Sequence, residues 1–370
     1  MIRVLQVMGG MNRRGAESFI MNVYRKIDRS KIQFDFLVYS NKHQDFEDEI
    51  VALGGRVLHM ECPNGIMAYK SIPMIKDIIR KYGPYKAIHA QTLFNICFPL
   101  LAAKNFPEIV RMSHSHSTKN RVHTNLIVRF YEWLSKKVIL KYTQVMFACG
   151  EPAGEYLFGE KFKTDGIILK NGIDLDVHAT RNKEAESRIR TQYELDGKLV
   201  IGSVARFDEV KNHAFMVNIA EALKKKGVNF KMLFIGNGDL MEKIFQQIME
   251  TNLQNYIAIV GLRNDIPDMM HVFDLFLMPS HFEGNPVTLV EAQAAGLPCV
   301  ITDNISDEMD MGLGLVHRCS LKDSPEVWAE AVLASSKNKC ADDVKIRKQI
   351  VANGFDAQTI ANQLMKIYLQ

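Results

Sequence analysis

The chain of 370 residues has a mass of 42.1 kDa, with 47% apolar and 24% charged residues, a composition typical of a globular enzyme rather than a disordered or fibrous protein. At about 150 residues per domain, this length predicts two domains. The net charge of +4 is uneven, because residues 1–172 carry 25 Lys/Arg against 15 Asp/Glu and residues 173–370 carry 21 against 27. The basic half indicates an anionic partner: nucleic acid, an anionic membrane or a phosphorylated small molecule.

Six cysteines are scattered along the chain without a C-x-x-C pair, which argues against a disulfide framework or a zinc site and is typical of a reducing compartment. The apolar start of the chain is too short for a signal peptide, and the longest other apolar stretch, residues 93–103, is about half the length of a membrane span. We therefore expect a cytoplasmic protein that does not cross a membrane.

Short apolar runs alternate with amphipathic runs of helical length along nearly the whole chain. The first half predicts strands at 2–8, 34–40, 56–60, 87–90, 110–116 and 145–150, and a helix at 16–27. The second half predicts strands at 199–205, 230–236, 256–261, 275–280 and 298–302, and a final helix at 357–368. Several strands are continuously apolar, as parallel strands buried on both faces are, so we predict an α/β fold with two wound parallel sheets. The polar stretch 166–196 predicts the hinge between them.

Ligands of such sheets bind beyond the carboxyl ends of the strands, so the residues that follow each strand are the candidates for function. The first strand runs into Gly9-Gly10 and then a helix, which lets backbone N–H groups approach a phosphate or a sugar. The spacing is not G-x-G-x-x-G, so a dinucleotide site is poorly supported, and a tight turn is the alternative.

Two further loops carry charges at these positions. Strand 199–205 is followed by Arg206 and Lys211, which can converge on one diphosphate, although a solvated loop is the alternative. Strand 275–280 is followed by Glu283, and then by a helix that we expect to be capped by Asn285 and to run to about Ala295. The N-terminus of this helix predicts an anion site, and the carboxylates near it fit sugar hydroxyls better than phosphates, unless they are simply surface residues.

The segment 119–141 combines six Lys/Arg and one Glu with apolar residues at helical spacing. We predict a helix whose apolar stripe (Ile127, Phe130, Tyr131, Leu134 and Val138) faces the core. Its basic side is a candidate for contact with an anionic membrane or a lipid-diphosphate acceptor. Nucleic acid is not expected, because no recognition motif accompanies the charge.

The spacing Glu283-x7-Glu291, within HFEGNPVTLVEAQAAGLP, resembles the E-x7-E motif of retaining, nucleotide-sugar glycosyltransferases of family four, which have the GT-B fold. Other short motifs follow in the order of that family: Gly9-Gly10 with Gly15-Ala16-Glu17, Asn171-Gly172-Ile173-Asp174, Arg206 with Lys211, Ile235-Gly236-Asn237-Gly238 and Gly261-Leu262-Arg263. The stretch GGMNRRGAESFIMNVYRKID is similar to transferases that build exopolysaccharide or capsule.

This resemblance implies an acceptor-binding domain over 1–170 and a nucleotide-sugar donor domain over 171–354, facing each other across a cleft, with the helix 355–370 packed back on the first domain. It implies transfer of a sugar from a nucleoside diphosphate, with UDP the expected nucleotide, to a glycan or lipid-linked acceptor. The implied site residues are His116, Glu283, Arg206 and Lys211 for catalysis, Gly10, Gly236, Gly261, Leu262, Arg263, Gly284, Val287, Thr288 and Glu291 for the donor, and Asn171 and Gly172 for the hinge.

Within that family pattern, Arg206 and Lys211 neutralise the diphosphate in place of a metal. Backbone N–H groups of the helix that holds Glu291 bind phosphate, and Glu291 itself holds the ribose. Glu283 binds hydroxyls of the transferred sugar, and Gly261 to Arg263 line the base pocket. No cofactor is therefore expected.

Family members usually place a histidine after the strand at 110–116, where this chain has His114 and His116. Alternate residues of a strand point to one face, so a metal pair is an alternative, but no further ligand cluster accompanies it. We favour His116, nearer the carboxyl end, as the active-site residue and His114 as structural. The sequence Asp174-Leu175-Asp176 mimics a metal-binding D-x-D motif of a different transferase fold, and we interpret it as part of the hinge.

Two other functions fit the same pattern. A UDP-sugar 2-epimerase of the same fold would isomerise the donor without an acceptor. A non-catalytic nucleotide-sugar-binding partner is disfavoured, because Arg206, Lys211, Glu283 and Glu291 are all present. The sequence does not reveal which sugar is transferred.

Overall fold

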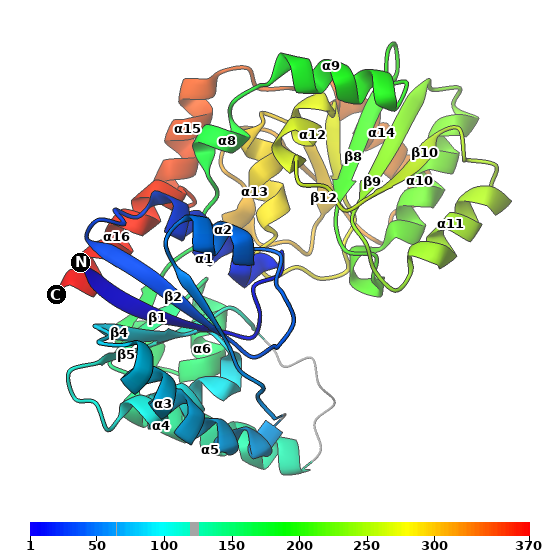
Figure 1. The fold of residues 1–370 in the computed structure, drawn as a ribbon. Coiled ribbons are helices and arrows are strands. Elements are labelled where there is room, and N and C mark those ends of the chain that lie inside the picture. The colour runs from blue at the N-terminus through cyan, green and yellow to red at the C-terminus, as the bar shows by residue number, and fades with distance from the viewer. Residues whose placement is uncertain (64, 119–125) are drawn as a thin grey trace. The chain divides into compact units, whose positions relative to one another are not determined.

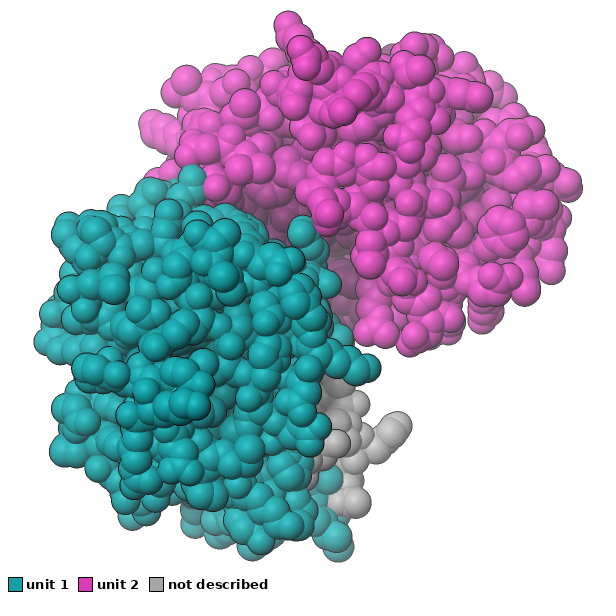
Figure 2. Space-filling view, viewed as in Figure 1, with its two compact units in different colours: residues 1–172, 356–370 teal, residues 173–355 magenta. Residues whose placement is uncertain are grey.

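The computed structural model describes residues 1–63, 65–118 and 126–370, which form two compact units, coloured separately in Figure 2. Unit 1 comprises residues 1–172 and 356–370, and unit 2 comprises residues 173–355. The chain therefore passes between the units twice, after Gly172 and after Phe355.

Unit 1 is built on a seven-stranded sheet in which all described strand pairs are parallel, in the order β3-β2-β1-β4-β5-β6-β7. Figure 1 labels its strands β1, β2, β4 and β5. The strands of unit 1 are β1 (Ile2–Met8), β2 (Ile32–Val38), β3 (Arg56–His59), β4 (Ala87–Ala90), β5 (Val110–Ser115), β6 (Val145–Ala148) and β7 (Gly166–Ile168). Its helices are α1 (Gly15–Lys26), α2 (Glu47–Ala52), η1 (Gly65–Lys70), α3 (Ser71–Tyr82), η2 (Leu93–Ile96), α4 (Cys97–Ala103), α5 (Leu126–Tyr142), α6 (Glu151–Phe158), α7 (Lys161–Asp165) and α16 (Ala357–Leu369).

Unit 2 is built on a six-stranded parallel sheet in the order β10-β9-β8-β11-β12-β13. Its strands are β8 (Leu199–Val204), β9 (Phe230–Ile235), β10 (Ile257–Gly261), β11 (Leu275–Met278), β12 (Cys299–Thr302) and β13 (Val316–Cys319). Its helices are α8 (Leu175–His178), α9 (Lys183–Gln192), η3 (Glu209–Lys211), α10 (His213–Lys225), α11 (Met241–Glu250), α12 (Ile266–Val272), α13 (Val287–Ala294), η4 (Asp307–Met309), α14 (Pro325–Ser335) and α15 (Asp343–Ala352).

Both sheets share the order of a doubly wound fold, so the predicted α/β class is confirmed. In each sheet, the second and third strands in sequence are added on one side of the first strand, and the later strands are added on its other side. The order reverses between β1 and β4 in unit 1, and between β8 and β11 in unit 2. Loops that follow these strands diverge at the reversal, which is where open α/β sheets bind ligands.

The predicted strands are found within two residues at each end, and the stretch 166–196, interpreted as the hinge, includes the point after Gly172 where the chain passes from unit 1 to unit 2. This stretch contains the short strand β7 and the helices α8 and α9. The strand has only three residues, and α9 buries only Ala185 and Ile189, so neither produces a clear apolar pattern. Strand β13 was also not predicted, because its sequence VHRC is short and has two polar residues in the middle.

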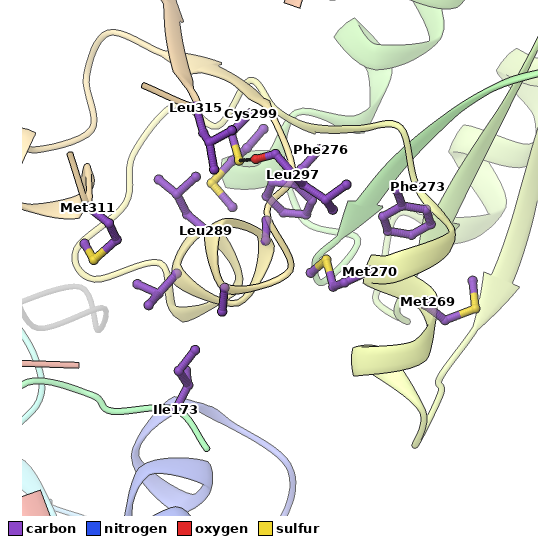
Figure 3. Close-up of a cluster of buried hydrophobic side chains, with 14 of the residues drawn as sticks. Ile173, Met269, Met270, Phe273, Phe276, Leu289, Leu297, Cys299, Met311 and Leu315 are labelled. Carbon is purple, nitrogen blue, oxygen red and sulfur yellow. Dashed lines mark hydrogen bonds between the residues drawn. The ribbon is translucent and has the colours of Figure 1, made fainter. Parts of the chain in front are cut away.

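Hydrophobic clusters cover both faces of each sheet. In unit 2, Leu289 of α13 packs with Phe276 of β11 and Cys299 of β12, as Figure 3 shows. This contact anchors the helix whose N-terminus follows the candidate carboxylate Glu283. Gly202 in β8 is required there, because a Cβ atom would lie 2.0 Å from the ring of Phe273.

The C-terminal helix α16 belongs to unit 1 and packs against α1 (Figure 1). Its residues Ile360, Ala361, Leu364 and Tyr368 are buried in the same cluster as Phe19. Their spacing of one, three and four residues places them on one face of the helix. One face of this C-terminal helix is therefore part of the core of unit 1.

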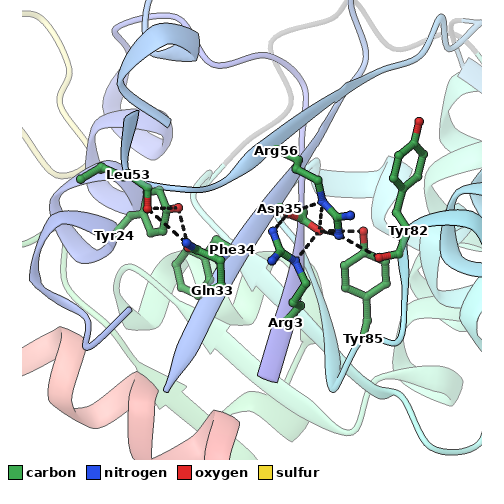
Figure 4. A network of polar contacts seen from close by, with 9 residues as sticks. All are labelled: Arg3, Tyr24, Gln33, Phe34, Asp35, Leu53, Arg56, Tyr82 and Tyr85. Carbon is green, nitrogen blue, oxygen red and sulfur yellow. Dashed lines mark hydrogen bonds and ion pairs between the residues drawn. The ribbon is translucent and has the colours of Figure 1, made fainter. Parts of the chain in front are cut away.

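A buried carboxylate links three neighbouring strands of unit 1 (Figure 4). Asp35 in β2 accepts hydrogen bonds from Arg3 of β1 at 2.6 Å and 3.1 Å, from Arg56 of β3, and from the Tyr85 hydroxyl at 2.9 Å. Burial by itself raises the pKa of Asp35, but the hydrogen bonds from Arg3, Arg56 and Tyr85 outweigh it and hold the pKa below its usual value.

We expect Asp35→Ala to lower the free energy of unfolding by about 3–5 kcal/mol, because it leaves two arginines without their shared carboxylate. Since the pKa of Asp35 is lowered on folding, its contribution is present above about pH 4 and is lost as the pH falls through the folded pKa. Urea unfolding at neutral and acidic pH measures both effects. Asp77→Ala, which removes an exposed ion pair with Arg80, is the control and should cost less than about 1 kcal/mol. Equal costs for the two variants would contradict this role.

Candidate functional site

Most candidate site residues of unit 2 follow β8, β9 and β11, which lie side by side in the order β9-β8-β11. Arg206 and Lys211 follow β8, Gly236 follows β9, and Glu283 follows β11. Because the three strands are parallel, these residues leave the sheet at the same edge. The sheet topology therefore brings together residues from three separate segments of the chain.

Lys211 and Glu283 form a close ion pair. The Lys211 Nζ atom lies 2.7 Å and 2.8 Å from the two carboxylate oxygens of Glu283. Only 24% of the lysine side chain and 8% of the glutamate side chain are exposed, so the pair is largely shielded from water. A cation and a carboxylate that are both shielded interact more strongly than a surface pair does.

The loops that carry this pair are held by hydrogen bonds between main chain and side chains. The Asp208 carboxylate accepts from the Lys211 backbone N–H at 3.2 Å and caps the turn η3. The next residue, Asn212, has a φ of +56° and donates its side-chain amide to the Pro279 carbonyl at 3.1 Å. The His281 N–H in turn donates to the Val210 carbonyl at 2.8 Å. The position of Lys211 relative to Glu283 is therefore fixed by the backbone.

Arg206 is presented differently. Its guanidinium donates to Asp239 at 3.1 Å, and the two side chains are 55% and 87% exposed. Such a pair contributes little to stability and is easily opened by a competing anion. Arg206 is thus accessible at the same edge as the shielded Lys211.

Two glycines shape the backbone of this edge, Gly236 by a close approach to a neighbouring loop and Gly261 by its positive φ. Gly236 has a φ of +144°, and a Cβ atom there would lie 2.0 Å from the Ala205 carbonyl oxygen. Its N–H donates to the carbonyl of Gly261 at 2.9 Å, and Gly261 has a φ of +80°. These contacts place the ends of β9 and β10 against the start of the loop that carries Arg206.

The segment after Gly261 runs along the end of the edge strand β10. Leu262 is exposed, and Arg263 donates to Asp265 from its Nε atom at 2.7 Å. The Arg263 guanidinium also donates to the Tyr193 hydroxyl at 3.5 Å. The segment therefore offers an apolar side chain and an oriented guanidinium at the edge of unit 2.

Helix α13 begins one residue later than the sequence predicted. Its N-cap is Pro286, with a φ of −72° and a ψ of 93°, and not Asn285, because the ψ of Pro286 lies outside the helical range. The N–H groups of Val287 and Thr288 are in the first turn, which has no intrahelical acceptors for them. A Cβ atom at Gly284 would meet no atom within 4 Å, so the approach to this terminus is open on that side.

Glu291, in the middle of α13, has a partner that the sequence did not suggest. The Nε2 atom of His178 lies 3.7 Å from a Glu291 carboxylate oxygen. The carbonyl of His178 accepts from His271 Nε2 at 3.0 Å, which holds the end of α8 in place. No sequence spacing links positions 178 and 291, so only the fold could identify this pair.

The remaining candidates belong to unit 1, which is described by itself. Gly10 follows β1, and a Cβ atom there would lie 2.8 Å from the side-chain oxygen of Gln44, which also accepts from the Met11 N–H at 2.9 Å. The absence of a Cβ atom at Gly10 thus lets Gln44 bind the turn. Packing against Gln44 therefore explains a glycine at position 10 without any contact with a ligand.

His116 lies just after β5, and its Nε2 atom is 2.9 Å from the Gln91 side-chain oxygen. The ring of His114 stacks on it, with ring centroids 4.0 Å apart, so both histidines lie on one side of the strand. His114 is fully buried and neither of its ring nitrogens has a hydrogen-bond partner among the described residues. Burial lowers the pKa of His116 to about 4, and a contact with Asn171 partly opposes this effect. His116 is therefore neutral at neutral pH.

The D-x-D sequence at the start of unit 2 has structural contacts. The Asp174 side chain accepts from the Asp176 N–H at 3.1 Å and caps α8, and Asp176 pairs with Arg347 at 3.0 Å. Over residues 1–63, 65–118 and 126–370, no three His, Cys, Asp or Glu side chains are arranged to hold a metal ion.

The expectation for the segment 119–141 is wrong in part. Residues 119–125 lie outside the described residues, and the rest forms α5. Tyr131 and Val138 pack against the core, whereas Ile127, Phe130 and Leu134 are exposed. Ser135 and Ile139 are buried on the same face as Tyr131 and Val138, so the core-facing stripe of α5 is rotated from the predicted one. In the described part of the chain, no helix is long and apolar enough to span a bilayer.

Comparisons with known proteins give a consistent result. A family model described as Glycosyl transferases group 1 matches residues 185–355, and one described as Glycosyltransferase Family 4 matches residues 13–177. EpsF of Bacillus subtilis, which is named as a glycosyltransferase, is 39% identical over 99% of this chain and 96% of its own length. CapH of Staphylococcus aureus, named as a capsular polysaccharide biosynthesis glycosyltransferase, is 24% identical over 100% and 99%.

Two further similarities concern a transferase and a solved structure. The Escherichia coli UDP-Gal:alpha-D-GlcNAc-diphosphoundecaprenol alpha-1,3-galactosyltransferase is 24% identical over 63% of this chain and 64% of its own length. The crystal structure of HepE from Anabaena in complex with UDP has a similar fold, with a TM-score of 0.76, 17% identity and coverage of 99% of both chains. The two parallel sheets and this likeness show the predicted GT-B fold.

We expect the Lys211–Glu283 pair to show a coupling energy of about 1–3 kcal/mol in a double-mutant cycle with Lys211→Met and Glu283→Gln, because both side chains are shielded. The exposed Arg206–Asp239 pair should give less than about 1 kcal/mol. Chemical unfolding of the four variants of each cycle measures both values. A coupling no larger than that of the exposed pair would show that Lys211 and Glu283 do not hold each other in solution.

Proposed function

This chain belongs to the glycosyltransferases of family 4, and we propose that it transfers a sugar from a nucleoside diphosphate to a hydroxyl of a glycan or lipid-linked acceptor in cell-surface polysaccharide synthesis. UDP is the proposed nucleotide, which the UDP in the HepE structure and the UDP-Gal in the name of the Escherichia coli relative support. The name of CapH supports the role in polysaccharide synthesis, and the diphosphoundecaprenol of the Escherichia coli relative supports a lipid-linked acceptor.

The observation that carries the proposal is the Lys211–Glu283 pair beside the N-terminus of α13. A diphosphate would compete with Glu283 for the lysine, because it carries more charge and also accepts from the helix N–H groups. Glu283 would then be released to accept hydrogen bonds from hydroxyls of the sugar. Binding of the donor would thus replace the Lys211–Glu283 ion pair by two contacts, one between Lys211 and the diphosphate and one between Glu283 and the sugar hydroxyls.

The proposed reaction retains the anomeric configuration. The acceptor hydroxyl attacks the anomeric carbon on the face that the diphosphate leaves, the bond to the diphosphate oxygen breaks, and the departing phosphate takes the acceptor proton. Arg206, Lys211 and the N–H groups of Val287 and Thr288 would stabilise the negative charge that grows on the leaving group. Such fixed donors and cations are the largest contribution that a protein makes to this kind of step. We propose that no metal ion takes part.

The other candidates would position the donor. Glu291 would hold the ribose hydroxyls, with His178 orienting its carboxylate. Gly261 to Arg263 would line the base, and Gly236 would allow the ribose to approach the backbone. In unit 1, His116 and Gly10 would contact the transferred sugar, with the boundary residues Asn171 and Gly172 acting as a hinge between an acceptor-binding unit 1 and a donor-binding unit 2.

We expect Arg206→Ala and Lys211→Ala each to lower kcat by about 100-fold to 1000-fold without unfolding the protein, because each removes a cation from the leaving group. Sugar transfer is measured by release of UDP, first as slow hydrolysis of a panel of nucleotide sugars and then with lipid-linked acceptors. Arg190→Ala, which removes an ion pair between Arg190 of α9 and Asp196, is the matched control and should retain activity. Near-normal turnover in both variants would overturn the assignment.

The same assay separates this function from an epimerase. A UDP-sugar 2-epimerase would convert UDP-GlcNAc to its epimer without any acceptor, whereas a transferase releases UDP. Formation of the epimer, with no UDP released, would contradict the proposed function.

We also propose that the protein works in the cytoplasm and contacts the inner face of an anionic membrane through α5. Leu126, Phe130, Trp133, Lys137 and Lys141 are spaced by three or four residues and are all exposed, so they share one face. The first three are 82%, 56% and 51% exposed and apolar, and the last two are cationic. Lys137 Nζ also lies 3.9 Å from the centre of the Trp133 ring. Aromatic residues beside lysines are typical of helices that lie in a membrane interface.

We expect Phe130→Ser/Trp133→Ser to weaken binding to anionic vesicles of phosphatidylglycerol and phosphatidylcholine at least about tenfold, because two large apolar side chains no longer enter the bilayer. Co-sedimentation with vesicles measures the affinity, and pure phosphatidylcholine should bind more weakly. The control is Phe245→Ser/Met249→Ser, which removes two exposed apolar side chains of α11. Equal binding by the wild type and both double variants would exclude this surface.

A further inference from the structure

A chain of hydrogen bonds runs through the core of unit 1 from His116 to the C-terminal helix. His116 Nε2 lies 2.9 Å from Gln91 Oε1, and Gln91 Nε2 donates to Gln6 Oε1 at 3.0 Å. Gln6 Nε2 donates to the Tyr368 hydroxyl at 3.2 Å, and that hydroxyl lies 2.6 Å from His89 Nδ1. Gln6, His89, Gln91 and Tyr368 are all buried, so none of these groups exchanges its partner for bulk water.

The polarity of this chain is set at its far end. Burial lowers the pKa of His89 to about 3, so its ring is neutral, and a phenol is a stronger donor to a neutral imidazole nitrogen than the reverse. When the Tyr368 hydroxyl donates to His89 Nδ1, its oxygen can only accept from Gln6. The side-chain amides of Gln6 and Gln91 then have the same orientation: the NH₂ group of each donates toward Tyr368, and the oxygen of each accepts from the neighbour on the His116 side.

The last link leaves one choice for His116. Gln91 presents its oxygen, so His116 donates an Nε2–H and its Nδ1 atom carries the lone pair. His116 is held in place by its neighbours as well, because its ring stacks on His114 and contacts Phe19 at 5.6 Å between centroids.

The Nδ1 side of His116 is where the structure leaves polar atoms without partners. His116 Nδ1 and Asn171 Oδ1 are both buried and have no hydrogen-bond partner among the described residues, although the two side chains interact. A buried ring nitrogen and a buried amide oxygen that both lack a partner favour a ligand that brings hydrogen-bond donors, such as hydroxyl groups. In the proposed function, the hydroxyls of a sugar are such donors.

We propose that Tyr368, acting through Gln6 and Gln91, is a positioning residue that holds His116 as the Nε2–H tautomer and so leaves its Nδ1 atom to accept a hydrogen bond from a sugar hydroxyl. The contact with a sugar rests on the proposed function, whereas the tautomer does not. Through Tyr368, the C-terminal helix α16 (residues 357–369) would determine the tautomer of His116, which follows β5.

The direct test is the tautomer of His116, measured by two-dimensional NMR of the full-length protein labelled with ¹⁵N at histidine, with His116→Gln used to assign the signal. We expect one Nε2–H form in the wild type. Tyr368→Phe, which keeps the ring and removes the hydroxyl, should give a mixture of tautomers. The matched control is Tyr24→Phe, which removes a fully buried hydroxyl of the same unit that donates to Gln33 at 2.6 Å and has no link to His116.

The kinetic test separates positioning from stability. Tyr368→Phe should lower kcat about threefold to tenfold at an unchanged KM for the nucleotide sugar, whereas Tyr24→Phe should leave kcat unchanged. If Tyr368→Phe fails to fold, Gln91→Leu breaks the same chain beside His116 and should give the same mixture of tautomers. Gln91→Glu restores the acceptor, so it should recover the Nε2–H form and shift the acidic limb of the pH–rate profile upward, because a carboxylate stabilises the charged ring.

Two results would overturn the proposal: an Nδ1–H form of His116 in the wild type, or an Nε2–H form that persists in both Tyr368→Phe and Gln91→Leu. Absence of sugar transfer by the wild type would instead refute the proposed function and would leave the NMR result to decide the positioning role.

Discussion

The parallel pairing of β8 with β9 on one side and β11 on the other is the constraint on which the candidate site depends. It forces three loops, which are separated by up to about 80 residues in sequence, to leave the sheet at one edge. Gly236 then lets the backbone of these loops pack closely, and hydrogen bonds between the loops fix the side chains. The strand order thus determines that Lys211 and Glu283 lie next to each other, and their opposite charges then allow the ion pair.

The charges of the site are balanced before any ligand arrives. Lys211 pairs with Glu283, Arg206 with Asp239, and Arg263 with Asp265, so each cation of unit 2 at this edge has a carboxylate partner. The overall acidic charge of residues 173–370 therefore does not describe this edge, where each of these cations lies beside a single carboxylate. Net charge describes the whole surface, whereas a diphosphate responds to the few cations and N–H groups that it can contact.

The strands were predictable because buried parallel strands have continuous apolar runs, and the loops that follow them were predictable from that order. The sequence could not predict the partners of the site residues, such as His178 for Glu291 or Gln91 for His116, because these contacts join segments with no regular spacing. It also misplaced the cap of α13 by one residue and the apolar stripe of α5, since periodicity identifies an apolar face without saying what covers it. The roles of the individual site residues stay predictions.

Unit 2 is inserted into unit 1 between Gly172 and Asp356, and its two ends lie together, because the Ile173 N–H donates to the Phe355 carbonyl at 2.8 Å. A domain whose termini are adjacent can be replaced by another with the same spacing without disturbing its host. The architecture therefore permits modular exchange: a recombination event at these two crossings would swap the whole of residues 173–355 and keep the sheet, the C-terminal helix and the His116 network of unit 1 intact.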